Sequence, residues 1–153
     1  MERIIECVPN FSEGRNMEVI DSIVNAIEKS GGVKILDVDP GEATNRTVVT
    51  FVGSPEAVVE AAFQGVKRAA ELKADNAVIQ TYAGTALSVQ AQNIEDPAQK
   101  KALYEEAIKY YDKAKELDPD RLQSNWGYNR YNAYYNLYGA DDPKTKQAEA
   151  DSK

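Results

Sequence analysis

Polar side chains in two segments of the first third of the chain have the types and spacing that could bind a ligand. The first set follows a short apolar run and the second set flanks a loop rich in turn-forming residues. The residues are Asn10, Ser12, Glu13, Asp39, Asn45 and Arg46. Amide and carboxylate groups can hold a polar ligand by hydrogen bonds, and a guanidinium can pair with a carboxylate. An alternative is that Asn10 and Ser12 satisfy backbone groups at a turn or cap, and that Asp39 begins an Asx turn.

A group suited to proton transfer near neutral pH is missing from the sequence. The 153 residues contain no histidine, which is the side chain whose ordinary pKa lies between 5 and 8. The single cysteine, Cys7, lies in an apolar run and is expected to be a core residue of a protein in a reducing compartment, the cytoplasm. We expect no metal.

Charge and hydropathy exclude several classes of partner. The net charge of −7 argues against binding to nucleic acid or to anionic membranes, because phosphates need clustered lysine and arginine. The longest apolar runs are only a few residues, too short to cross a bilayer. The first residues, "MERIIEC", lack the pattern of a signal peptide.

The elements that would position the polar residues alternate between strands and helices. Apolar and β-branched runs predict strands at 3–8, 33–38 and 47–52, and helical spacing predicts a helix at 16–30 that stops at Gly31. Ser54, Pro55 and Glu56 have the pattern of a helix start, and that helix is predicted to run to about Leu72. Its inward residues are expected to be Val59, Ala62, Phe63, Val66 and Ala70.

The order β-α-β-β-α is a truncated ferredoxin-like unit that lacks the sixth element. In that fold the last strand pairs with the first, so the strand at 3–8 is expected to keep an unpaired edge. Residues 77–81, "AVIQT", are either a short substitute strand or the first turn of the next helix. An unpaired edge favours self-association.

The composition changes abruptly near Lys73. Eleven of thirteen valines and all three phenylalanines lie in residues 1–73, whereas all nine tyrosines and Trp126 lie in residues 74–153. We therefore predict an α+β unit at 1–73 followed by an all-α module at 74–140 and a polar tail at 141–153. A natural fusion, an engineered chimaera and an erroneous gene model are all compatible with such a change.

The second part has the spacing of a helical repeat. Ala107, Tyr111, Ala114 and Pro119 have the small–aromatic–small–proline spacing of the second helix of a tetratricopeptide repeat, which they resemble. Residues 76–95 are predicted to be its partner helix, and residues 125–139 the first helix of a following repeat. The resemblance implies tetratricopeptide-like helices that bind a peptide or pack on other repeats. The tyrosines at 128–138 would be either repeat core or a partner-binding surface.

Three motifs of the first part resemble one enzyme family in order and spacing. They are "ECVPNFSEGR" (6–15), "ILDVD" (35–39) and "TNRTVVTFVGSPEAVVEAA" (44–62). Together they resemble the N-terminal subdomain of glutamate formiminotransferase over residues 2–72. The resemblance implies transfer of a formimino group from N-formiminoglutamate to tetrahydrofolate, with no further cofactor. It also implies that Asn10 and Asp39 face the formimino substrate and that Arg46 steers a carboxylate.

The resemblance stops at Leu72. The family continues into a His-Pro-Arg-Met-Gly type motif whose histidine is assigned the role of general acid/base, whereas this chain continues as "KADNAVIQTYAG". Tyr82 stands near that position by count, but an ordinary pKa near 10 makes it a poor substitute. The second subdomain, which closes the folate site, is not in these 153 residues either.

We therefore expect no catalytic residue, no catalysis by this single chain, and weak or no binding of tetrahydrofolate. The alternative is a protein-interaction module in the helical part, with the N-terminal unit as a passenger.

Overall fold

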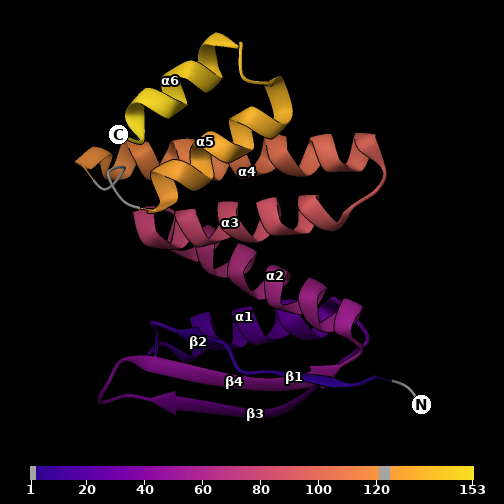
Figure 1. Ribbon diagram of the computed structural model, residues 1–153. Coiled ribbons are helices and arrows are strands. Elements are labelled where there is room, and N and C mark those ends of the chain that lie inside the picture. Colours follow the sequence, from indigo (N-terminus) through magenta and orange to yellow (C-terminus); the bar gives the residue numbers. More distant parts are fainter. Residues whose placement is uncertain (1–2, 121–124) are drawn as a thin grey trace. The chain divides into compact units, whose positions relative to one another are not determined.

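Figure 1 shows the computed structural model, which describes residues 3–120 and 125–153. The chain divides into two compact units, Met1–Leu72 and Lys73–Lys153. The described residues contain no helix with the length and hydropathy needed to cross a membrane. A small antiparallel sheet with helices is followed by helices alone, so the predicted class, α+β followed by all-α, is confirmed.

The sheet of the first unit is built around one central strand. The strands are β1 (Ile5–Cys7), β2 (Asn10–Phe11), β3 (Val33–Gly41) and β4 (Arg46–Gly53). β1 and β2 pair with one edge of β4 and β3 pairs with the other, all antiparallel. The predicted first strand is thus two short strands separated at Pro9, which has no N–H to donate to the ladder. The carbonyl oxygen of Pro9 still accepts a hydrogen bond from the Val49 N–H.

Two helices, α1 (Met17–Lys29) and α2 (Pro55–Leu72), cover one face of this sheet (Figure 1). Successive residues of a strand point to opposite faces, and the buried residues of β4 are Thr47, Val49 and Phe51. The core of the unit consists of Val49 and Phe51 with Ile23, Ile27, Val58 and Ala61 from the helices. The expectation that Val59 faces inward is wrong, because Val59 is 54% exposed and its neighbour Val58 takes the buried position.

The first strand keeps an open edge. Residues 77–81 belong to a helix, so they do not extend the sheet. Among the described strands, β1 pairs only with β4. Ile4 and Val8, which flank β1, are 69% and 51% exposed.

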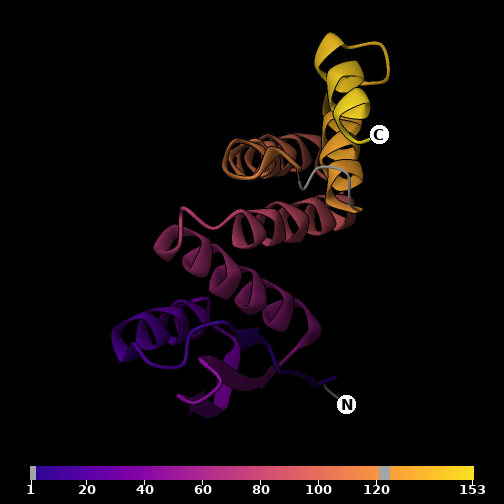
Figure 2. The ribbon, with the colours of Figure 1, turned by 90° about the vertical axis from the view of Figure 1, so that its left-hand side faces the viewer.

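The second unit consists of helices α3 (Ala77–Asn93), α4 (Pro97–Leu117), α5 (Asn125–Tyr138) and α6 (Pro143–Asp151) (Figures 1 and 2). Asn76 and Asp96 cap the first two through side-chain oxygens that accept backbone N–H groups. α3 and α4 approach closely at Gly84, where a Cβ atom would lie 3.0 Å from the Tyr111 ring. Tyr111 is 1% exposed and its hydroxyl donates to Thr85 Oγ1 over 3.2 Å.

The expectation of a polar tail at 141–153 is wrong, because most of this segment is helix α6. Asp142 caps the helix by accepting the Lys144 N–H, and Thr145 and Ala148 are both 1% exposed. The segment has no apolar period because its packing relies on two small residues and on ion pairs made by Asp151.

Candidate functional site

The polar turn after β2 begins helix α1. One carboxylate oxygen of Glu13 accepts the backbone N–H groups of Gly14, Arg15 and Asn16 at 3.0–3.1 Å. Asn16 is the N-cap and accepts the next N–H groups of the helix. Asn10 and Ser12 are exposed and do not serve as this cap. The capping function therefore belongs to Glu13 and Asn16.

The β3–β4 hairpin holds this turn from the other side. Asn45 has a φ of 51°, and its side-chain oxygen accepts the Gly14 N–H over 3.1 Å. The Thr47 hydroxyl, which is 1% exposed, donates to the Glu13 carbonyl oxygen over 2.5 Å. A Cβ atom on Gly14 would lie 2.5 Å from the Arg46 nitrogen. Asn45, predicted to line a ligand site, thus has a structural contact, and the sequence reading missed Gly14 and Thr47.

Asn10 and Asp39 occupy one row across the sheet. Asn10 on β2 and Asp39 on β3 are both register partners of Val48 on β4. Residues directly opposite one another in a sheet share a face, and Val48 points away from the face that buries Val49. Strands lie about 4.8 Å apart, so the Asn10 and Asp39 backbones are separated by roughly 10 Å.

Arg46 lies on the same sheet face as Asn10 and Asp39, one row further toward the start of β4. It is the register partner of Gly41 and precedes Val48 by two residues on β4, so both side chains leave the strand on the same side. Two residues of a strand span about 7 Å. The structure therefore brings Asn10, Asp39 and Arg46 to one end of the sheet face that the helices leave open. All three are exposed, so they form an open polar surface and not a closed cleft.

This surface can bind a small ligand with separated charges. Asp39 accepts hydrogen bonds, Asn10 donates and accepts them, and Arg46 offers five N–H donors that match a carboxylate. A ligand with N–H donors at one end and a carboxylate about 7–10 Å away would contact all three residues.

The single cysteine, Cys7, is not a substitute for the missing base. Cys7 is the register partner of Phe51 and packs against the core, as predicted. Burial raises the pKa of its thiol, so the thiol is neutral near pH 7. Within the described ranges, 3–120 and 125–153, no cluster of three or more histidine, cysteine, aspartate or glutamate side chains could hold a metal ion.

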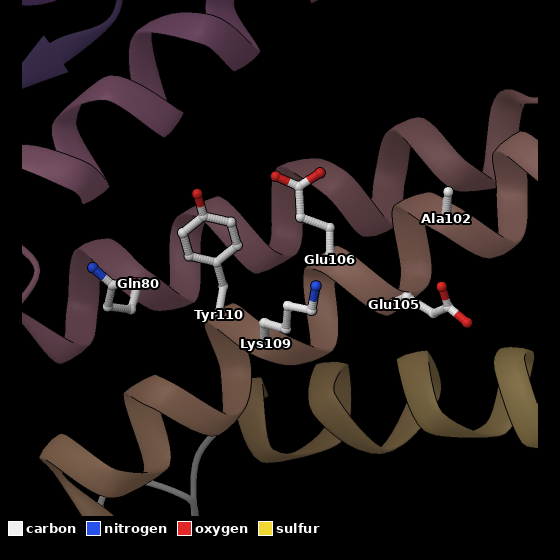
Figure 3. A pocket seen from close by; sticks show the side chains of 6 residues that line it. All are labelled: Gln80, Ala102, Glu105, Glu106, Lys109 and Tyr110. Carbon is white, nitrogen blue, oxygen red and sulfur yellow. The ribbon is translucent and has the colours of Figure 1, made fainter.

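Two hollows lie elsewhere. One of about 610 Å³ lies at the opposite end of the strands in the first unit and is lined by residues that include Arg3, Ile4, Gly53 and Glu56. The other, of about 510 Å³, lies on the helical unit, where Gln80 comes from α3 and the remaining side chains from α4 (Figure 3). Its lining residues are Gln80, Ala102, Glu105, Glu106, Lys109 and Tyr110. Neither hollow contains Asn10, Asp39 or Arg46.

The matches to known proteins reported below lie almost entirely in the first unit. Residues 4–74 match the family described as "Formiminotransferase domain, N-terminal subdomain". The formimidoyltransferase-cyclodeaminase of Rattus norvegicus is 57% identical over 72 residues, which are 47% of this chain and 13% of that protein. The glutamate formimidoyltransferase of Streptococcus pyogenes is 48% identical over 71 residues, 46% of this chain and 24% of that protein. The resemblance of the first unit is therefore confirmed, and the chain spans less than a quarter of the length of these relatives.

Proposed function

We propose that the first unit carries a substrate-contact surface of a formiminotransferase and that this chain alone does not catalyse formimino transfer. The observation that carries the proposal is the position of Asn10 and Asp39 on either side of Val48, with Arg46 in the next row. N-Formiminoglutamate has the matching chemistry, because its formimino group offers N–H donors and its glutamate part offers carboxylates. Asp39 and Asn10 hold the formimino group, and Arg46 pairs with a carboxylate.

Catalysis needs more than this surface. Formimino transfer moves a proton between two amines, and the sequence has no histidine to carry it. Losing a general acid/base typically costs about 10²–10⁴-fold in rate. Tetrahydrofolate is the size of a drug molecule, and such ligands bind in pockets that bury most of their surface. An open sheet face therefore binds tetrahydrofolate weakly or not at all.

Substrate contact is tested by titrating the ¹⁵N-labelled full chain with N-formiminoglutamate and following backbone amide signals. We expect shifts at Asn10, Asp39, Arg46 and Val48, and their loss in Asp39→Asn. The matched control is Asp37→Asn, because Asp37 lies on the same strand and face, opposite Thr50. Shifts that survive Asp39→Asn, or that disappear equally in Asp37→Asn, would contradict the proposal.

A second function, a protein-interaction module, is proposed for the helical unit. It is supported by the close packing of α3 and α4, in which Ala107, Tyr111 and Ala114 are at most 1% exposed, at the spacing of a tetratricopeptide helix. The test is selection of binders to the full chain from a random peptide library of about twelve residues displayed on phage. We expect selected peptides to shift the amide signals of residues in α3–α6. Failure to enrich any such peptide would contradict this second function.

A further inference from the structure

Arg46 lies at the last rung of the β3–β4 hairpin. It is the first residue of β4, and its register partner Gly41 is the last residue of β3. The ends of strands next to a loop open more readily than the middle of a sheet. A guanidinium that is to meet a ligand carboxylate in a fixed place therefore needs a further contact that holds its backbone.

The turn that precedes α1 supplies this contact on both sides of Arg46. The residue before it, Asn45, accepts the Gly14 N–H through its side-chain oxygen over 3.1 Å. The residue after it, Thr47, donates its hydroxyl to the Glu13 carbonyl oxygen over 2.5 Å. Gly14 also lies against the Arg46 backbone, since a Cβ atom on Gly14 would be 2.5 Å from the Arg46 nitrogen and 2.8 Å from its oxygen. Arg46 is thus held through both neighbours and through its own main chain.

The turn lies behind the strand, on the face opposite to the Arg46 side chain. Thr47 points to the face that the helices cover, because it is buried on β4 together with Val49 and Phe51. Its bond to Glu13 places the turn on that face, whereas the Arg46 side chain leaves β4 on the other. The contacts therefore hold the backbone and leave the guanidinium accessible. Arg46 is exposed, and it pairs with no carboxylate among the residues that the structure describes.

The backbone of Asn45 has the left-handed conformation that few side chains tolerate. Its φ is 51°, the only positive φ of a residue other than glycine in the described part of the chain. This conformation is costly for most residues and less so for asparagine, and it persists where surrounding contacts hold it. Here the bond from the Gly14 N–H is such a contact. Residues of this kind cluster at functional sites, and Asn45 directly precedes the arginine of the proposed substrate surface.

We propose that Asn45 and Thr47 are positioning residues, which hold Arg46 in the place where its guanidinium meets a ligand carboxylate. The proposal rests on the substrate-contact function of the first unit. Both residues act through the backbone of Arg46, since Thr47 is 1% exposed and the Asn45 side-chain oxygen is bound to Gly14. An arginine that is already held in place loses less freedom when it binds a ligand. The two residues therefore strengthen binding at the carboxylate end of the ligand and not at its formimino end.

The test measures the affinity of the full chain for two ligands by titrating the Val48 amide signal. One ligand is N-formiminoglutamate, and the other is its diamide, in which both carboxylates are replaced by uncharged amides. Asn45→Gly removes the side-chain oxygen but keeps a residue that adopts a positive φ readily. It should weaken the binding of N-formiminoglutamate about two- to fivefold, as the loss of an exposed ion pair does, and leave the affinity for the diamide unchanged.

The same pattern is expected at Thr47. Thr47→Val removes the hydroxyl and keeps the size and branching of the side chain, so it should weaken the binding of N-formiminoglutamate and not that of the diamide. Thr47→Ser keeps the hydroxyl and should retain the wild-type affinity. The control is Ile27→Val, in the core near the end of α1 that lies farthest from the turn. The lost methyl group destabilises the first unit, but the affinity for both ligands should stay unchanged.

A double substitution separates positioning from a general structural role. Arg46→Gln alone should weaken the binding of N-formiminoglutamate about two- to fivefold. Adding Asn45→Gly to Arg46→Gln should weaken it no further, because a residue that acts only through Arg46 has no effect without it. A residue that merely stabilises the sheet would show the same effect in both backgrounds.

Three results would overturn this inference and leave the substrate-contact function intact. They are an unchanged affinity for N-formiminoglutamate in Asn45→Gly and Thr47→Val, equal losses for the two ligands, and a loss from Asn45→Gly that persists in the Arg46→Gln chain. A wild-type chain that shows no shift with N-formiminoglutamate would overturn the substrate-contact function and this inference together.

Discussion

Arg130 on α5 binds Asp151 at the end of α6, with its Nη1 atom 3.0 Å from the Oδ2 atom of the carboxylate. The Nε atom of the same guanidinium lies 2.8 Å from Oδ1 of Asp112 on α4. Tyr134 donates its hydroxyl to Oδ2 of Asp112 over 2.7 Å, and Lys115 also pairs with Asp151. One buried guanidinium thus joins three helices of the second unit.

Replacing Asp151 by asparagine should destabilise the helical unit by about 1.5–3 kcal/mol near pH 7, the range for a hydrogen bond to a charged group. All nine tyrosines and Trp126 lie in residues 74–153, so urea unfolding followed by intrinsic fluorescence reports this unit selectively. The control is Asp141→Asn, because Asp141 forms only an exposed ion pair with Lys146, whose contribution is small. Equal effects of the two substitutions would contradict the role of Asp151.

The effect of Asp151→Asn should also depend on pH. Burial raises the pKa of Asp151, but the hydrogen bonds from Lys115 and Gln147 and the charges of Lys115 and Arg130 outweigh it, so the net pKa is lowered. A carboxylate with a lowered pKa stabilises the fold above its ordinary value of about 3.9 and loses that contribution as the pH falls through its folded value. The difference between wild type and variant should therefore be constant above about pH 5 and shrink below about pH 4. A stability difference between wild type and Asp151→Asn that grows on acidification would contradict a lowered pKa of Asp151.

Gly14→Ala should destabilise the first unit by about 1–3 kcal/mol, the usual cost of overpacking, because the added Cβ would meet the backbone of Arg46 and Gly41 at 2.5 and 2.6 Å. The measurement is amide hydrogen exchange at Val49 and Phe51 in the core of that unit. Ser12→Ala in the same turn changes an exposed residue and should have almost no effect. The fluorescence transition of the helical unit should not move with Gly14→Ala. A coupled shift would mean that the two units do not unfold independently.

The open edge of β1 should make the chain self-associate. Unpaired strand edges bind other strands, and Ile4 and Val8 beside this edge are largely exposed. Light scattering over a concentration series should show species larger than a monomer, and Ile4→Lys should reduce them because charge protects edges. The matched control is Val59→Lys, an exposed position on α2. A monodisperse monomer with a high melting temperature would contradict this expectation.

Local signals predicted most of the elements. Gly31 ends α1, the Ser54–Pro55 pair begins α2, and the Ser54 hydroxyl accepts the Ala57 N–H as its pattern indicates. The features that the sequence did not predict, such as helix α6, depend on contacts between residues far apart in the chain. Helix α6 is held by Asp151 against Arg130, twenty-one residues away, and by two small side chains that give no apolar period.

The candidate site was predictable only in part. The resemblance to the formiminotransferase subdomain named Asn10, Asp39 and Arg46, but only the register of three strands places the first two beside Val48. Asn45 was expected beside them, yet it accepts the Gly14 N–H across a separation of thirty-one residues. No periodicity reports such a contact, because it depends on how the hairpin and the turn meet.

Whether this chain alone catalyses formimino transfer is tested by mixing the purified chain with N-formiminoglutamate and tetrahydrofolate. Formation of the formimino-folate product is followed over time. We expect no product above the uncatalysed background, because the chain has no histidine and the proposed substrate surface is open. Inserting the family's histidine segment after Leu72 is the change expected to raise the rate. Product formed by the unaltered chain at a rate that Asp39→Ala abolishes and Asp37→Ala leaves intact would contradict the account.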